Sequence, residues 1–249
     1  ESLENAQAAN SSIPLILYLS GLTCTDENVC QKGYPFPHCF ANGLAFLAPD
    51  TSPRGAGIEG EDNTWQFGTG AGFYCDATEA PYSSNYNMYS YVVDELLSFV
   101  FAEWKVLNES KISIMGHSMG GMGALQIALK NPSRFKSVSC FAPLANPTKT
   151  ELSRNAFTKY LGIDESTWQQ YDPCSIVATS EANYDDILID VGDKDDFVSD
   201  GTLKVENFIE AAKAANKKVT LNIREGYDHA YWFVSSFMKD HIEFHATRL

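Results

Sequence analysis

The chain has 249 residues, of which 44% are hydrophobic, enough to bury one sizeable core. Its formal net charge is −14, and the acidic side chains are scattered along the sequence rather than gathered in blocks. This balance excludes nucleic acids and anionic membrane surfaces as the main partners, because both are bound through clustered Lys and Arg side chains.

Apolar runs of strand length alternate along the chain with segments of helical periodicity. The runs that predict strands, each bounded by turn residues, are 13–19, 44–49, 111–115, 137–141, 186–191 and 218–224. The segments with apolar residues at helical spacing are 86–104, 119–131, 202–216 and 230–246. Continuous apolar strands that alternate with helices predict an α/β fold, with a mostly parallel sheet covered by helices on both faces.

Two longer segments interrupt this alternation. The Gly-rich stretch 52–82 and the stretch 145–183, rich in Pro, Thr and Tyr, are expected to be inserted loops. Long loops in a compact domain usually carry function. Because the sequence has no internal repeat, low-complexity tract or linker, it predicts a single domain over residues 1–249.

A tight glycine-rich turn joins the predicted strand 111–115 to the helix 119–131. Its sequence, GHSMG, fits the pattern G-x-S-x-G between a strand and a helix. The chain reverses so sharply there that side chains two residues on either side would clash, and glycine removes them. The turn lifts the Ser118 hydroxyl above the carboxyl ends of the strands, at the start of a helix. We therefore interpret Ser118 as a nucleophile, with an N-capping serine as the alternative.

A serine hydroxyl becomes a good nucleophile when a histidine takes its proton, and an acid orients that histidine. Of the five histidines, His229 lies in the loop between the last strand and the final helix, at the carboxyl edge of the sheet. The others are expected to be structural: His38 precedes the serine, His117 packs under the turn, and His241 and His245 are solvated or capping residues. His229 is therefore the predicted base.

The loop after the strand 186–191 offers three candidates for the acid, Asp193, Asp195 and Asp196. The acid is expected here because α/β-hydrolases carry the triad in the order serine, acid, histidine. The spacing G-x-x-D-x-x-V selects Asp195. The alternatives are that Asp193 is the acid rather than a residue that caps the turn, or that Asp196 is the acid rather than a solvated side chain.

Acyl transfer also needs N–H groups that stabilise an oxyanion. The Met119 N–H lies at the start of the helix that follows Ser118. A second donor is expected from the loop SGLTC, which follows the first strand. There Gly21 lets the backbone turn so that the Leu22 N–H faces Ser118, although a plain turn glycine is the alternative.

Six cysteines are spaced irregularly, with no CxxC pair and no Cys/His cluster of zinc spacing. The first residues, ESLENAQAANSS, lack the basic and apolar regions of a signal peptide. No apolar run reaches the ~20 residues that span a bilayer. We therefore expect free thiols in a reducing, cytoplasmic protein, with disulfides as the alternative.

Several long motifs together resemble the S-formylglutathione hydrolase family, also called esterase D. The motifs are LSGLTCT (19–25), APDTSPRG (48–55), TWQFGTGAGFYCDAT (64–78), MYSYV (88–92), GHSMGGMGAL (116–125) and EGYDHAYWF (225–233). The resemblance implies an α/β-hydrolase fold and hydrolysis of the thioester S-formylglutathione to glutathione and formate, a step in formaldehyde detoxification. It also implies a homodimer that acts on a small molecule and needs no metal or cofactor.

The family's functional residues carry over onto matching positions of this sequence. Its catalytic residues and oxyanion donors correspond to Ser118, Asp195 and His229 and to the backbone of Leu22 and Met119. Its cysteine near the active site corresponds to Cys24. Because glutathione has two carboxylates, we look for a cation at the mouth of the site, where Arg54 and Lys32 are candidates. A solvated surface role is the alternative for both.

The sequence departs from the family at two places. Family members have strands before the one at 13–19, and this chain starts too late to hold them. The segment 31–42 is also less like the family than its flanks. Two rival functions use the same residues, a general carboxylesterase for small acyl esters and a non-catalytic interaction domain. All three triad residues are present, which favours an enzyme.

Overall fold

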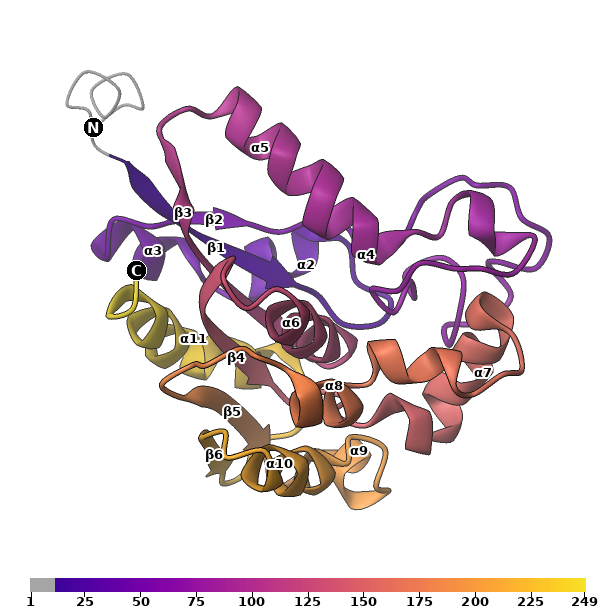
Figure 1. Cartoon of the computed structure of the whole chain (residues 1–249). Helices are drawn as coiled ribbons and strands as arrows, with labels where there is room; N and C mark the ends of the chain where they lie inside the picture. Colours follow the sequence, from indigo (N-terminus) through magenta and orange to yellow (C-terminus); the bar gives the residue numbers. More distant parts are fainter. Residues whose placement is uncertain (1–11) are drawn as a thin grey trace.

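Six strands form one parallel sheet in the order β2-β1-β3-β4-β5-β6 (Figure 1). The computed structural model describes residues 12–249. The strands are β1 (Ile13–Leu19), β2 (Ala45–Leu47), β3 (Leu107–His117), β4 (Phe135–Phe141), β5 (Ile187–Gly192) and β6 (Val219–Arg224). The predicted α/β fold with a mostly parallel sheet is confirmed, and each predicted strand overlaps one of these six.

Helices cover both faces of this sheet. On one face α6 packs against β1, β3 and β4, and α8 and α10 lie beside it; α11 packs against β4 on the other, next to α2 and α3 (Figure 1). The α-helices are α2 (Asp26–Lys32), α3 (Phe36–Ala41), α4 (Met88–Ser90), α5 (Leu97–Glu103), α6 (Met119–Lys130), α7 (Glu151–Leu161), α8 (Pro173–Thr179), α9 (Asp196–Ser199), α10 (Val205–Ala214) and α11 (Tyr231–Ala246). Among residues 12–249, no helix is both long and apolar enough to cross a bilayer.

The helix expected at 86–104 is built from three pieces. Between α4 and α5 the chain forms a π-helical segment, η2 (Tyr91–Leu96), so that the three run on as one helix along the sheet (Figure 1). The side chains of Val92, Val93, Leu97 and Val100 are buried. The apolar periodicity therefore identified the buried face, whereas the wider π turn left no local signal in the sequence.

The two insertions differ from each other. Residues 52–81 contain no helix or strand beyond residues of two isolated bridges, as expected for a loop. The stretch 145–183, predicted as a loop, is instead largely helical: it holds α7, α8 and the short 3₁₀ segments η3 (Pro147–Lys149) and η4 (Thr167–Tyr171). Its prolines misled the prediction because Pro147 and Pro173 occupy first helical positions, where a missing N–H costs nothing.

The short helices α2 and α3 also escaped prediction. Thr25 caps α2 by accepting a hydrogen bond from the Glu27 N–H, and the Asn28 side chain accepts one from the Thr25 N–H. This reciprocal arrangement is a capping box built with Asn in place of the usual Glu or Gln. A helix of seven residues has too few turns for its apolar spacing to be recognised.

The expectation that His241 and His245 are solvated is wrong. Both histidines lie on α11, and their side chains are fully buried against β4. The ring nitrogens of His245 lie 2.7 Å from Ser137 Oγ and 2.8 Å from Ser139 Oγ, and His241 Nδ1 lies 2.9 Å from Ser139 Oγ. These serines alternate on one face of β4, and they allow polar rings to be buried because hydrogen bonds replace those to water.

The order of the strands decides where a ligand can bind. After β1 the chain crosses to β2 on one side, and β3 then pairs with β1 on the other. In an open parallel sheet such a reversal leaves a crevice at the carboxyl ends of the two strands. The buried apolar side chains, from Leu15 to Ile242, form one continuous cluster beneath it. That continuity supports our proposal that the chain folds as one domain.

Candidate active site

Ser118 forms the turn between β3 and α6, at this crevice. Its backbone has φ 58° and ψ −120°, a conformation that costs energy for any residue with a Cβ atom. The hydroxyl makes no capping hydrogen bond to α6, so the alternative of an N-capping serine has no support in the structure. Instead the partly exposed side chain lines a cavity. The turn thus presents a hydroxyl that no structural contact uses.

Glycines on both sides make the turn possible. A Cβ at Gly116 would lie 2.2 Å from the Gly120 carbonyl oxygen, and a Cβ at Gly120 would lie 2.0 Å from the Leu19 carbonyl oxygen. The clash expected from the motif is therefore real. A Cβ at Gly21 would lie 3.0 Å from Ser118 Cβ, so the loop after β1 lies directly against the serine.

Asp195 and His229 meet beside Ser118. His229 Nδ1 lies 2.6 Å from Asp195 Oδ2. The carboxylate is fully buried and the histidine side chain is 20% exposed. Donation from Nδ1 to the carboxylate fixes the tautomer that leaves Nε2 without a proton. His229 Nε2 has no hydrogen-bond partner among residues 12–249, and His229 lines the same cavity as Ser118.

Of the three candidate aspartates, the structure brings only Asp195 to His229. Its second oxygen, Oδ1, accepts a hydrogen bond from the Phe197 N–H at 2.9 Å and caps α9. Asp193 is exposed, where it accepts the Gly226 N–H at 2.6 Å and pairs with Lys194. Asp196 is also exposed. These positions match the spacing argument, which favoured Asp195.

The His229 ring is packed between two other rings. The centroid of His117 lies 4.6 Å away and that of Phe197 lies 4.8 Å away. Burial lowers the pKa of His117 well below its usual value, and the nearby His229 lowers it further. His117 is therefore a neutral ring that packs against His229, as expected from its place in the turn.

The backbone N–H groups of Leu22 and Met119 are the predicted oxyanion donors. In the loop after β1, the Thr23 N–H donates to the Gly70 carbonyl at 2.8 Å and the Cys24 N–H to the Gly21 carbonyl at 3.3 Å. The Leu22 N–H has no hydrogen-bond partner within the part of the chain that the structure describes. Met119 is the first residue of α6, whose N–H groups lack helical partners. Both donors are thus free to bind a ligand.

The cavity that holds these groups has a volume of about 370 Å³. Its apolar wall is formed by Trp65, Leu144, Leu152, Phe197 and Leu203. Trp65 and Leu152 come from the two insertions, which the sequence marked as functional without identifying these side chains. A tryptophan inside a glycine-rich stretch was the available signal. Within residues 12–249, no group of three or more His, Cys, Asp or Glu side chains is arranged to hold a metal ion.

Comparisons with known proteins agree with this geometry. The model of the esterase family, described as putative esterase, matches residues 4–244. S-formylglutathione hydrolases of Mus musculus and Paracoccus denitrificans are 48% and 44% identical over 243 residues, covering 98% and 97% of this chain and 86% and 85% of theirs. The solved structure of an S-formylglutathione hydrolase from Agrobacterium tumefaciens has a TM-score of 0.92 at 46% identity, covering 98% of this chain and 87% of that one.

The chain belongs to the S-formylglutathione hydrolase family.

In this member of the S-formylglutathione hydrolase family, Arg54 and Lys32 do not line the catalytic cavity. Arg54 forms an ion pair with Asp50, with Nη2 and Oδ1 2.7 Å apart, and also donates to the Cys24 carbonyl at 3.1 Å. Lys32 is exposed in the last turn of α2. Charge alone suggested both residues, but the packing of the chain directs Arg54 toward a backbone carbonyl behind the site.

Cys24 does line the cavity, as the resemblance to the S-formylglutathione hydrolase family implied. Its side chain is 8% exposed, and Tyr231 Oη donates toward its sulfur at 3.9 Å. Burial raises the pKa of this thiol. All six cysteines are free thiols, as the sequence predicted.

Proposed function

We propose that this protein is a serine hydrolase that cleaves the thioester S-formylglutathione to glutathione and formate, and so takes part in formaldehyde detoxification. The observation that carries the proposal is the 2.6 Å contact between His229 Nδ1 and Asp195 Oδ2, beside a serine on a strained turn. The substrate is assigned from relatives named S-formylglutathione hydrolase, which are 44–48% identical over nearly the whole chain.

The first half of the reaction forms an acyl-enzyme. His229 Nε2 takes the proton from Ser118 Oγ as the oxygen attacks the formyl carbon. The carbonyl oxygen becomes an oxyanion, which the N–H groups of Leu22 and Met119 stabilise. The intermediate then collapses: the carbon–sulfur bond breaks, glutathione leaves as the thiolate and takes up the proton that His229 holds.

The second half releases the acid. A water molecule gives a proton to His229 Nε2 and attacks the formyl carbon of the acyl-enzyme. Collapse of this second intermediate breaks the bond to Ser118 Oγ, which regains its proton from His229, and formate departs. In both halves the buried Asp195 carboxylate stabilises the imidazolium form of His229 and holds its ring in place.

A general carboxylesterase activity toward small acyl esters is the second candidate. The observation that favours it is the apolar wall of the cavity, formed by Trp65, Leu144 and Phe197 among others. A formyl group is too small to need this wall, whereas an aryl or alkyl group would bury apolar surface against it. Both activities use the same Ser118 and differ in the acyl group and in the leaving group.

Steady-state kinetics on S-formylglutathione and p-nitrophenyl acetate separate these candidates. We expect kcat/KM to be at least about 100-fold higher for the thioester, because binding of the glutathione moiety contributes to the transition state. A higher value for the aryl acetate would contradict the proposal and favour the carboxylesterase. Ser118→Ala serves as the blank, since it removes the nucleophile for both substrates.

We further propose that the protein acts in the cytoplasm and as a homodimer. The free thiols support a reducing compartment. Several large apolar side chains are exposed, including Phe40 at 84% and Ile163 at 89%, and such side chains are often covered in an oligomer. Light scattering after gel filtration tests the second proposal, because a dimer has twice the chain mass of 27.5 kDa. A monomer at micromolar concentration would contradict it.

A further inference from the structure

The loop that carries Leu22 contains a strained turn. Within this loop, defined as residues 20–25, the hydrogen bond from the Cys24 N–H to the Gly21 carbonyl closes a four-residue turn. At the third position of that turn Thr23 has φ 68°. A β-branched residue with positive φ is a rare outlier, and its backbone conformation costs energy. Contacts from outside the loop must therefore hold this conformation.

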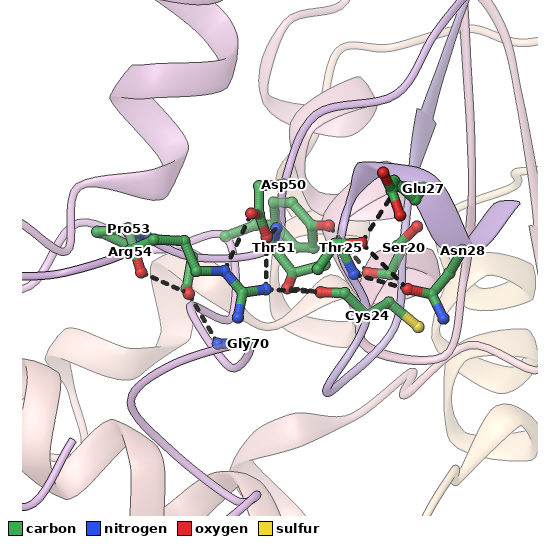
Figure 2. A network of polar contacts seen from close by, with 12 residues as sticks. Ser20, Cys24, Thr25, Glu27, Asn28, Asp50, Thr51, Pro53, Arg54 and Gly70 are labelled. Carbon is green, nitrogen blue, oxygen red and sulfur yellow. Dashed lines mark hydrogen bonds and ion pairs between the residues drawn. The ribbon is translucent and has the colours of Figure 1, made fainter. Parts of the chain in front are cut away.

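Two side chains hold the end of the turn at Cys24 (Figure 2). The Cys24 carbonyl oxygen accepts hydrogen bonds from Thr51 Oγ1 at 2.5 Å and from Arg54 Nη2 at 3.1 Å. Arg54 is fixed in turn by Asp50, because Nε lies 3.0 Å from Oδ2 and Nη2 lies 2.7 Å from Oδ1. A two-point contact of this kind sets the plane and direction of a guanidinium group.

The same segment, 50–54, also restrains the Thr23 N–H, through Gly70. Ser52 Oγ accepts a hydrogen bond from the Gly70 N–H at 2.7 Å, and the Gly70 carbonyl accepts one from the Thr23 N–H at 2.8 Å. The strained residue is thus held on both sides, through its own N–H and through the carbonyl of the residue that follows.

Loss of the Arg54 contact would weaken the restraint on Thr23. The residue would then relax toward negative φ, and the adjoining peptides would rotate with it. Gly21 is packed against Ser118, so such a rotation changes the direction of the Leu22 N–H relative to the serine. Oxyanion donors act only when they are already placed at the developing charge, and errors of about 1 Å can cost ~100-fold in rate.

We propose that Arg54 is a positioning residue of the active site. Together with Asp50 and Thr51 it fixes the Cys24 carbonyl, and through the strained turn it aims the Leu22 N–H at the oxyanion. Arg54 does not line the catalytic cavity, and its guanidinium is held by Asp50 and the Cys24 carbonyl. The inference rests on the proposed Ser118 site but is independent of which acyl donor that site prefers.

The test compares Arg54→Met with the wild-type enzyme on p-nitrophenyl acetate and on S-formylglutathione. Methionine keeps much of the side-chain length and removes every donor. We expect kcat to fall roughly 10- to 100-fold, less than the 10²–10³ that loss of a whole oxyanion donor costs, while KM changes less than about threefold. Arg54→Lys should recover only part of kcat, because a point charge cannot bind both partners of the planar guanidinium.

The chain offers a matched control in Arg154. Its guanidinium also pairs with one carboxylate, of Glu165, and donates to one backbone carbonyl, of Thr148, at 3.0 Å. The two arginine side chains are equally exposed, at 39%. Arg154→Met should therefore lower Tm about as much as Arg54→Met while kcat stays within about twofold of wild type.

A second variant keeps the test informative should Arg54→Met not fold. Thr51→Val removes the other donor to the same carbonyl and nearly preserves volume, so we expect a smaller loss of kcat, roughly 3- to 10-fold. In the double variant the two effects should not add, because both act through the Cys24 carbonyl.

Three results would overturn the proposal: a folded Arg54→Met enzyme with kcat within threefold of wild type, an equal loss of kcat in Arg154→Met, or a loss confined to KM. If Arg54→Met does not fold, an unchanged kcat in Thr51→Val would do the same. A wild-type enzyme that cleaves the aryl acetate but not S-formylglutathione would instead refute the proposed function and leave this test intact.

Discussion

Among residues 12–249, two histidines lie within 4 Å of an aspartate: one of these pairs borders the catalytic cavity and the other is fully buried. The open pair is His229 with Asp195, which follows the end of β5. The buried pair is His241 with Asp190, which lies within β5. Each pair consists of the same two residue types, but the surrounding groups favour a catalytic role for the first pair and a structural role for the second.

The difference lies in what each ring nitrogen contacts. In the open pair, Nδ1 binds the carboxylate at 2.6 Å and Nε2 is left free beside Ser118. In the buried pair, His241 Nδ1 lies 2.9 Å from Ser139 Oγ, and Nε2 lies 3.6 Å from Asp190 Oδ2, too far for a hydrogen bond. A histidine–aspartate pair becomes a catalytic base only when one nitrogen is fixed and the other meets a substrate.

Asp190 has stronger partners than His241. It accepts hydrogen bonds from Arg224 Nε at 2.6 Å and from Asn222 Nδ2 at 2.8 Å. The His241 ring stacks on Phe141 with centroids 3.8 Å apart. Burial lowers the pKa of His241, although Asp190 opposes this shift. The buried pair therefore contributes packing and a polar cluster in which Asp190 is paired, while His241 Nε2 has no hydrogen-bond partner among residues 12–249.

The largest expected effect comes from removing the serine next to each pair. Ser118→Ala should lower kcat roughly 10⁴- to 10⁶-fold with folding intact, because the nucleophile is lost. Ser139→Ala should leave kcat within about twofold but lower the free energy of unfolding by about 1–3 kcal/mol, since buried ring nitrogens lose a partner. Esterase assays and urea unfolding of both variants measure this. A folded Ser118→Ala protein that keeps most of its activity would contradict the role of Ser118.

The aspartates give the next largest contrast. In Asp195→Asn, the side-chain oxygen is expected to keep the bond from the Phe197 N–H, which turns the amide NH₂ toward His229 Nδ1. The ring would then carry its proton on Nε2, the wrong tautomer for a base. We expect kcat to fall at least ~100-fold, by analogy with the ~10⁴-fold loss in a serine protease. Asp190→Asn should instead reduce stability and leave kcat within about threefold.

Asp193→Asn and Asp196→Asn are controls for that contrast. Both side chains are exposed, so we expect kcat within about threefold of wild type for each. The assays should be run above about pH 7.5, where a histidine of ordinary pKa is neutral. If Asp193→Asn is the most damaged variant and Asp195→Asn is nearly normal, the acid must be reassigned to Asp193.

The pH dependence of stability tests whether the buried histidines stay neutral in the folded protein. Burial lowers the pKa of His117, His241 and His245. The unfolded chain, with histidine pKa values near 6.5, therefore binds more protons than the folded one below that pH. Stability should be fully present above about pH 6.5 and be lost as the pH falls, by at most about 1.4 kcal/mol per pH unit for each histidine.

Urea unfolding at pH 7.5, 6.5 and 5.5 measures that dependence. His241→Gln removes one of the three groups, so the variant should be less stable than wild type at pH 7.5 but should lose less stability between pH 6.5 and 5.5. Equal stability of the wild-type protein at pH 7.5 and 5.5 would show that these rings do not resist protonation.

The smallest effect is expected at Cys24, which lines the same cavity as His229 and which we predict takes no part in the reaction. Cys24→Ala should keep kcat within about threefold of wild type. A bulky thiol reagent should inactivate the wild-type enzyme and spare the variant. At pH 7 this inactivation should be slow, because burial raises the pKa of the Cys24 thiol and keeps it protonated. A dead but well-folded Cys24→Ala enzyme would require a different mechanism.

The features that the sequence predicted best are those set by local sterics. The elbow at Ser118 follows from GHSMG between a strand and a helix, since only glycine fits at 116 and 120. The meeting of Asp195 and His229 follows from two loops at the same edge of a parallel sheet. Short apolar runs located the six strands, most clearly β1, β4 and β5, which are largely buried between the two layers of helices.

The features that the sequence did not predict depend on partners far along the chain. Burial of His241 and His245 requires Ser137 and Ser139, which lie more than 100 residues earlier. The backbone partner of Arg54 is the Cys24 carbonyl, 30 residues away. Charge and periodicity are read over short stretches of sequence, and these contacts join residues that lie much farther apart. The predicted surroundings of these side chains were therefore wrong.

The backbone torsion of Ser118 has a consequence for laboratory evolution. Glycine adopts φ 58° and ψ −120° far more readily than serine, and the Ser118 hydroxyl caps nothing that glycine would leave uncapped. Ser118→Gly should thus be at least as thermostable as the parent while inactive. A library selected only for heat resistance would therefore enrich inactive members at this codon. Selections on this scaffold need a catalytic readout in every round to keep the serine.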